Sequence, residues 1–201
     1  MALGASTLVL GKWLPFAKAK IPKTTPVPNL TTNPKKILVA YESQFGSTAE
    51  VAEAIGQVLS AKGNQVSVKK IKDVTSLDDY GKVVIGSAIQ YDKWMPEARD
   101  FAKMHRKSLG EKEVACFLVC LVLSKGTKKA IAKAKGYALK INELMPSVPA
   151  DSIGQFAGVL DYSKMSFGQR LAAKALFAII GVKEGDYRNW QAIRDWAGGL
   201  F

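Results

Sequence analysis

Histidine and cysteine are nearly absent from this 201-residue chain, which has one histidine and two cysteines. Cys116 and Cys120 lie four residues apart in one apolar run, 114–123. As part of a strand, that spacing puts both on the same face but too far apart for a disulfide. We therefore predict two buried free thiols. Because the single histidine, His105, falls in a basic helical stretch, and no cluster of cysteine and histidine is available, no metal site is predicted.

Acidic residues are also scarce, since 17 Asp and Glu stand against 29 Lys and Arg, for a formal net charge of +12. The segment 124–140 concentrates this excess, with six lysines and no acid: Lys125, Lys128, Lys129, Lys133, Lys135 and Lys140. Such a segment can bind an anionic membrane surface or an acidic substrate, or it can be a solvated helix face. Nucleic acid is not expected as a partner, because the segment has one aromatic residue and no recognised binding motif.

A hydrophobic run long enough to span a bilayer is missing from the N-terminal part, where the small apolar stretch 2–10 is too short. We interpret residues 1–34 as a leader or anchor followed by a linker rich in Pro and Thr, and residues 35–201 as one folded domain. Ala17-Lys-Ala19 has the form of a signal-peptidase site, but no basic segment precedes the apolar run, so export would require a start further upstream. The alternative is an anchor lying in the membrane interface.

The loop that follows the apolar run Ile37-Leu-Val-Ala40 lacks the lysine of a nucleotide triphosphate P-loop and the three spaced glycines of a dinucleotide fingerprint. It reads Ser43-Gln-Phe-Gly-Ser-Thr48, and a helical pattern begins at Ser47. A strand that turns through such a loop into a helix directs hydroxyls and backbone amides to one point at the positive end of the helix dipole. This favours a single phosphate, and FMN as the cofactor. The alternative is a Ser or Thr N-cap on an ordinary helix.

The rest of the chain alternates between strand and helix patterns, which predicts a doubly wound α/β fold with five parallel strands and helices on both faces. Further strands are predicted at 65–70, 82–87, 114–123 and 153–160, and further helices at 96–109 and 128–144. Ligands of such sheets bind beyond the carboxyl ends of the strands. Three loops are thereby selected: 43–48, 87–91 with Trp94 close behind, and 120–124.

An isoalloxazine ring needs flat apolar cover, which Tyr91 and Trp94 can provide, although either could be a core or rim aromatic. None of the loops has a nicotinamide-binding pattern, so we expect electrons from another source. The candidate cofactor-binding residues are Ser43, Gln44, Phe45, Gly46, Ser47, Thr48, Ser87, Ala88, Ile89, Gln90, Tyr91, Trp94, Cys120, Leu121 and Val122.

The loop at 43–48 resembles the phosphate loop of the flavodoxin superfamily. Three further segments narrow the resemblance: Val83-Val-Ile-Gly-Ser-Ala-Ile-Gln-Tyr91, Phe156-Ala-Gly-Val-Leu-Asp-Tyr162 and Asp186-Tyr-Arg-Asn-Trp190. Together they make residues 36–199 similar to the quinone-dependent protoporphyrinogen IX dehydrogenases, a flavodoxin-like branch of bacterial haem biosynthesis. The resemblance implies the strand order 2-1-3-4-5, FMN, a porphyrinogen substrate that is hydrophobic and carries two propionates, and a membrane quinone as acceptor.

The sequence at 166–180 predicts an amphipathic basic helix that a minimal flavodoxin fold does not contain. It either packs on the sheet edge or faces a membrane or the substrate. We expect an FMN-dependent oxidoreductase in which hydride passes to the flavin and electrons pass on to quinone, with no catalytic side chain assigned. The alternative is a flavodoxin-type carrier between redox proteins, although the acidic surface typical of carriers is missing. The expected location is peripheral on the cytoplasmic face of a membrane; export after cleavage of a truncated leader is the alternative, which cytosolic haem synthesis would not allow.

Overall fold

Five parallel strands form the centre of the protein, as seen in a computed structural model that describes residues 36–149 and 152–201. They are β1 (Lys36–Glu42), β2 (Val66–Lys70), β3 (Tyr80–Gln90), β5 (Glu113–Cys120) and β6 (Ile153–Ala157). Their order in the sheet is β2-β1-β3-β5-β6, which confirms the predicted order 2-1-3-4-5 of a doubly wound sheet. The expectations for residues 1–34 lie outside the described residues.

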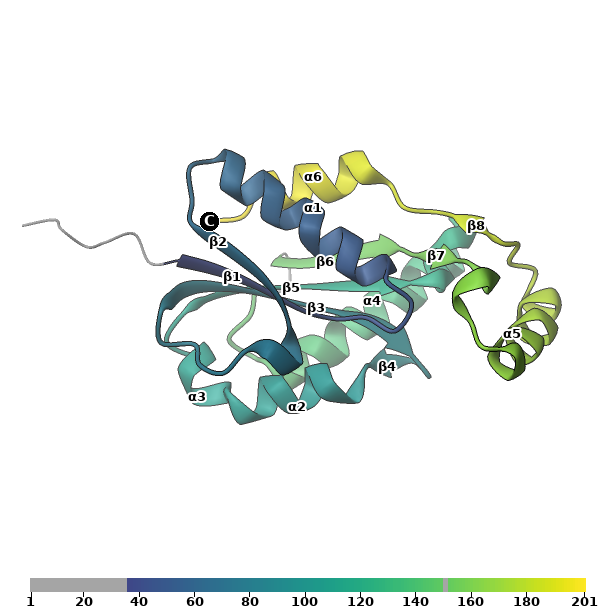
Figure 1. Ribbon diagram of the computed structural model, residues 1–201, viewed down its shortest axis with the longest axis horizontal. Coiled ribbons are helices and arrows are strands. Elements are labelled where there is room, and N and C mark those ends of the chain that lie inside the picture. Colours follow the sequence, from purple (N-terminus) through teal and green to yellow (C-terminus); the bar gives the residue numbers. More distant parts are fainter. Residues whose placement is uncertain (1–35, 150–151) are drawn as a thin grey trace, which may run out of the picture. The chain divides into compact units, whose positions relative to one another are not determined.

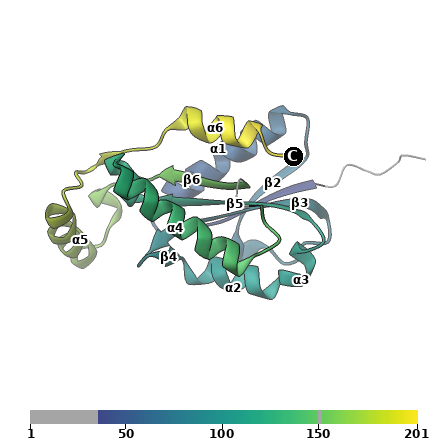
Figure 2. The same cartoon turned by 180° about the vertical axis from the view of Figure 1, so that it is seen from behind.

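Helices cover both faces of the sheet, with α1 (Ser47–Ala61) and α6 (Trp190–Gly198) on one side. The other side carries α2 (Pro96–Met104), α3 (Arg106–Leu109) and α4 (Lys128–Leu144) (Figures 1 and 2). Each face has its own core: Phe117 packs with α1 and α6, whereas Cys116 and Leu118 face α2 and α4. Burial on both faces explains why the central strands are continuous hydrophobic runs. No helix in the described part of the chain combines the length and apolarity needed to cross a membrane.

Several element boundaries differ from the predictions. The strand predicted at 114–123 ends at Cys120, and Leu121–Lys125 form a 3-10 turn, η2, because neither neighbouring strand continues to pair there. The strand predicted at 153–160 breaks at Gly158 because Val159–Leu160, β7, leave the sheet and pair antiparallel with Gly185–Asp186, β8. The helix predicted at 96–109 is interrupted at His105, between α2 and α3.

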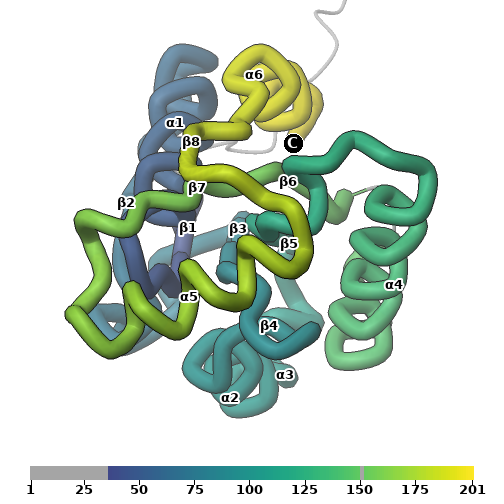
Figure 3. The backbone as a smooth tube through the Cα atoms, turned by 90° about the vertical axis from the view of Figure 1, so that its right-hand side faces the viewer, coloured from purple at the N-terminus to yellow at the C-terminus, as the bar shows by residue number. Residues whose placement is uncertain are grey.

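The segment between β6 and α6 is the main addition to the five-stranded core. It contains β7, a 3-10 turn at Tyr162–Lys164 (η4), helix α5 (Phe167–Ile180) and β8. A capping box of Ser166 and Gln169 starts α5, and Gly181, at φ 67°, ends it. The segment lies at the carboxyl-end side of the sheet, and in the view toward that side it passes in front of the strand ends (Figure 3). The helix predicted at 166–180 is thus present, but it has no buried residue and does not pack on the sheet edge.

Candidate functional site

The loop between β1 and α1 has the geometry of an anion-binding helix N-terminus. Gly46 is the N-cap residue of α1, in a left-handed conformation with φ 93°, and no side chain caps this end. Ser43 Oγ instead accepts a hydrogen bond from the Gly46 backbone amide, 3.1 Å away, which folds the loop. The first amides of α1 therefore remain available for an external acceptor. The alternative of an ordinary Ser or Thr cap does not describe this helix.

Thr48 carries the most direct sign of a missing ligand. Its side chain is fully buried, yet Oγ1 has no hydrogen-bond partner within the described parts of the chain. Leaving a buried hydroxyl unpaired costs about 1–3 kcal/mol, so proteins rarely retain one without a use for it. A phosphate seated on the loop would supply the acceptor. The residues present therefore fit the monophosphate of FMN.

Two cations from the segment between β6 and α6 lie at this end of α1, Lys164 beside Gly46 and Arg188 beside Glu50, and neither was among the predicted site residues. Lys164 Nζ lies 3.6 Å from the position of a Cβ built on Gly46 and 3.6 Å from Glu50 Oε1. Arg188 has a side chain only 7% exposed; its Nη1 lies 2.6 Å from Glu50 Oε2, and its Nη2 lies 2.6 Å from Asp186 Oδ2. Both cations offset the charge of Glu50, which otherwise disfavours an anion in the first turn of α1.

Tyr91 stands at the tip of a tight hairpin at the end of β3. Gln90 pairs with Lys93 of the short antiparallel strand β4 (Lys93–Trp94), so that Tyr91 and Asp92 form a two-residue turn. Both have positive φ, 47° and 60°, a conformation that costs a non-glycine residue on the order of 1–3 kcal/mol. Tyr91 is 97% exposed. The turn presents Tyr91 to solvent at the ligand edge of the sheet, and its role as cover for the flavin stays a prediction.

Contacts on two sides hold this turn in place. On one side, the amide of Gln90 donates a hydrogen bond to Gln44 in the phosphate loop. On the other side, Asp92 accepts from the Tyr137 hydroxyl and pairs with Lys133 at 2.9 Å, both from α4. The hydrogen bond from Tyr137, and to a smaller extent that from Lys133, holds the pKa of Asp92 below its ordinary value. Burial, and then the bond to Asp92, raises the pKa of Tyr137 to about 12, so the phenol stays protonated at neutral pH.

The remaining predicted site residues have different positions. Ser87 is fully buried, and its hydroxyl donates to the Ala88 carbonyl at 2.9 Å and accepts from the Met95 amide at 3.1 Å, so its bonds are made within the protein. Trp94 is 4% exposed and packs in the core against α2 and α4, unlike the exposed Tyr91. Phe45, Gly46, Ser47, Ala88, Ile89, Gln90, Leu121 and Val122 are all partly exposed around the loops.

The third loop begins at Cys120, the last residue of β5. Cys116 and Cys120 are free and buried, as predicted. Burial raises the pKa of both thiols, that of Cys120 to about 11, so neither is a thiolate at neutral pH. In residues 36–149 and 152–201, no group of three or more His, Cys, Asp or Glu side chains is arranged to hold a metal ion.

Comparison with known proteins agrees with this geometry. The sequence model of a family described as "Flavodoxin domain" matches residues 38–186. Two similar proteins carry the name protoporphyrinogen IX dehydrogenase [quinone]. The one from Escherichia coli strain K12 is 27% identical over 170 residues, which cover 81% of this chain and 92% of that protein. The one from Leishmania major is 29% identical over 170 residues, which cover 81% of this chain and 73% of that protein.

Solved structures with a similar fold include flavodoxins. A flavodoxin from the domain Archaea superposes with a TM-score of 0.44 at 22% identity, covering 72% of this chain and 95% of that one. Flavodoxin 2 from Bacillus cereus, in its oxidised form, gives a TM-score of 0.48 at 21% identity, covering 72% of this chain and 99% of that one.

Proposed function

This chain belongs to the flavodoxin domain family, and on that premise we propose that it is a dehydrogenase that oxidises a porphyrinogen and passes the electrons to a membrane quinone. The protein is a flavoprotein whose cofactor is FMN. When bound, FMN supplies the redox chemistry, because a flavin can accept a hydride and pass the electrons on to a second acceptor. The similar proteins from E. coli and Leishmania major, both named protoporphyrinogen IX dehydrogenase [quinone], support the proposed porphyrinogen substrate and quinone acceptor.

The phosphate loop and the Tyr91 turn have separate tasks in this proposal. Thr48, Ser43 and the first amides of α1 hold the phosphate, and Lys164 adds positive charge beside it. Tyr91 provides an exposed aromatic face, kept in position by the anchored Asp92. The function of these groups is to bind and orient, and no side chain is assigned as the base that removes the substrate proton.

The observation that favours a dehydrogenase over a soluble carrier is helix α5. The described residues leave several of its apolar side chains uncovered, since Phe167 is 83% exposed and Ile179 84% exposed. Leu171, Leu176 and Ile180 are exposed on the same helix. Exposed apolar surface of this extent marks an interaction site. The helix lies at the carboxyl-end side of the sheet, where the flavin binds.

Charge around α5 fits the same assignment. The segment 162–185 contains Lys164, Arg170, Lys174 and Lys183 with one acid, Glu184. A surface that combines apolar side chains with cations suits the anionic, cytoplasmic leaflet of a membrane, in which a quinone dissolves, and also a macrocycle that carries propionates. We therefore propose that it is a peripheral protein on the cytoplasmic face of a membrane.

An anaerobic oxidation assay tests the activity. The FMN-loaded full chain is mixed with protoporphyrinogen and a quinone in anionic vesicles, and porphyrin fluorescence is followed. We expect porphyrin formation that depends on both protein and quinone. If no porphyrin forms above the protein-free control while the reduced protein still transfers electrons to a redox protein, the assignment fails and the carrier function is correct.

A vesicle-binding assay tests the role of α5. Replacing Phe167 and Ile179 together by serine should weaken binding to anionic vesicles at least tenfold, because each buried side chain of this size contributes about 1.5–3 kcal/mol. Met104→Ser, on α2, is the matched control, since Met104 is 78% exposed but lies outside the segment. Unchanged binding by the double variant would exclude α5 as the docking element.

A further inference from the structure

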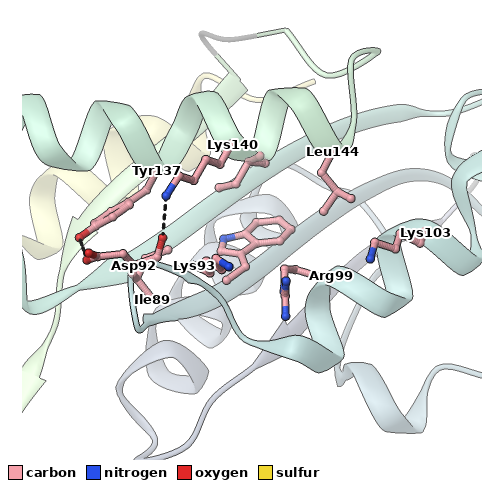
Figure 4. A pocket seen from close by; sticks show the side chains of 10 residues that line it. Ile89, Asp92, Lys93, Arg99, Lys103, Tyr137, Lys140 and Leu144 are labelled. Atoms are coloured by element: carbon pink, nitrogen blue, oxygen red, sulfur yellow. Dashed lines mark hydrogen bonds between the residues drawn. The ribbon is translucent and has the colours of Figure 1, made fainter.

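A cavity opens between helices α2 and α4, next to the Tyr91–Asp92 turn. Its volume is about 200 Å³. Figure 4 shows Tyr137, Lys140 and Leu144 of α4 on one side and Arg99 and Lys103 of α2 on the other. The lining residues are Ile89, Asp92, Lys93, Trp94, Arg99, Lys103, Tyr137, Lys140, Ile141 and Leu144.

The direction of the two helices leads most of this cavity away from the flavin site, although Ile89 and Trp94, two of the predicted cofactor-binding residues, line its near end. In a parallel sheet with crossover helices, each helix runs back toward the amino ends of the strands. Lys103 and Leu144 lie at the ends of α2 and α4, and therefore far from the carboxyl edge at which flavin binds. The cavity begins at the Asp92 turn and extends along the helices away from that edge.

Positive charge dominates the rim. Lys93, Arg99, Lys103 and Lys140 are four cations among the lining residues, against one acid, Asp92. The charge of Asp92 is already engaged, because Lys133 lies 2.9 Å from its carboxylate and Tyr137 donates a hydrogen bond to it. An anion in the cavity would therefore meet a net positive potential.

Two buried donor atoms belong to residues that line the cavity. Trp94 is 4% exposed, and its indole Nε1 has no hydrogen-bond partner among the residues described. The Nε of Arg99, also inaccessible to solvent, likewise lacks a partner in the described ranges. Ile89, Ile141 and Leu144 make the remaining surface apolar. An apolar cavity with a few unpaired donors is the usual form of a small-molecule site.

We propose that this cavity binds a small amphipathic anion, with an apolar body of one or two rings or a short acyl chain and one carboxylate or phosphate group. The apolar body would lie against Ile141 and Leu144, and the anionic group would lie among the cations Arg99, Lys103 and Lys140. The indole of Trp94 lines the same cavity and would be beside the ligand. The volume of about 200 Å³ is below the roughly 300–1,000 Å³ of sites that enclose a drug-sized ligand, so a small molecule fits this cavity better than a macrocycle does. The proposal does not depend on the activity proposed above.

The indole N–H of Trp94 gives a direct readout, because the chain has four tryptophans and each gives one such NMR signal. The FMN-loaded, ¹⁵N-labelled full chain is titrated with 2-naphthoate, with its neutral analogue 2-naphthamide, and with monomeric dihexanoyl phosphatidate. Trp94→Phe identifies the signal. We expect 2-naphthoate to shift this signal saturably and to bind about tenfold more tightly than 2-naphthamide. Titration with dihexanoyl phosphatidate shows whether a lipid headgroup, as well as a free carboxylic acid, can provide the anion.

Charge variants provide the control. Arg99→Gln and Lys103→Gln should each weaken binding by roughly threefold to tenfold, whereas Lys107→Gln, at an exposed lysine of α3 outside the cavity, should have no effect. Unchanged spectra elsewhere show that the variants remain folded. The proposal is refuted if neither anion saturates the Trp94 signal at millimolar concentration, or if only signals of α5 respond. Equal affinity for 2-naphthoate and 2-naphthamide would refute the proposal that the cavity selects an anion.

Discussion

Replacing Thr48 by valine separates a ligand-binding hydroxyl from a structural one, because the two roles predict opposite changes in stability. Valine has nearly the same shape, so packing is kept while Oγ1 is removed. That oxygen is buried without a partner among the described residues. Without FMN, we therefore expect the free energy of unfolding to rise by about 1 kcal/mol, since the cost of an unpaired buried hydroxyl disappears.

With FMN, the same substitution should weaken binding. A hydrogen bond to a charged group contributes about 1.5–3 kcal/mol, which corresponds to a roughly 10- to 100-fold increase in the dissociation constant. Adding Ser43→Ala should bring the loss to about 2–5 kcal/mol, because Ser43 also organises the Gly46 amide. Flavin fluorescence titration measures the affinity, and chemical denaturation of the apoprotein measures the stability.

Thr127→Val is the matched control. Thr127 is the N-cap of α4, and its hydroxyl accepts from the Ala130 amide at 3.2 Å. Its removal should lower the free energy of unfolding by about 1 kcal/mol and leave FMN affinity unchanged. If Thr48→Val destabilises the apoprotein as Thr127→Val does, the hydroxyl is structural. If FMN affinity does not change, the phosphate binds elsewhere.

Three further predictions concern the same site. Flavin released by heat should be identified chromatographically as FMN; recovery of FAD would contradict the single-phosphate loop. Lys164→Gln should weaken FMN binding about fivefold, by about 1 kcal/mol, because Lys164 lies beside Gly46. The effect should be smaller at high salt, because the Lys164 side chain is half exposed. An effect on FMN affinity that does not depend on salt would show that the charge of Lys164 is not its cause. Asp92→Asn should lower the free energy of unfolding at neutral pH. Because the pKa of Asp92 is lowered in the folded protein, the stability that its carboxylate contributes is present above the unfolded pKa of about 3.9 and is lost as pH falls through the folded pKa. The stabilities of the wild-type protein and of Asp92→Asn should therefore converge in acid. A constant difference between their denaturation curves across that pH range would argue against the ion pair.

Local patterns predicted most of the fold correctly. The helix at 128–144 has the bounds of α4, and the loop at 43–48 leads into a helix at Ser47 as its sequence indicates. Hydrophobic periodicity and turn residues determine such elements, because they depend on neighbours within a few positions. Strand ends were less accurate, since Cys120 and Gly158 mark places where the partner strand stops pairing, which is a property of the sheet.

Tyr91 and Trp94 show what a local pattern leaves undetermined. Both were predicted as flavin cover, but although they are only three positions apart, Tyr91 is 97% exposed and Trp94 is 4% exposed. The reversal of the chain at the hairpin turn, fixed by Asp92 and α4, directs them to different surroundings. One ring remains at the ligand edge, and the other lines a cavity between two helices.

The sequence by itself determined the layered fold, the phosphate loop and the choice of FMN, because each depends on residues close together in the chain. The tertiary structure decided that Lys164 and Arg188, more than a hundred residues from the loop, reach Glu50 beside it. It also decided that α5 has no partner within the described fold. Amphipathicity shows that a helix has an apolar face, but only the completed packing of sheet and helices shows whether the protein itself covers that face.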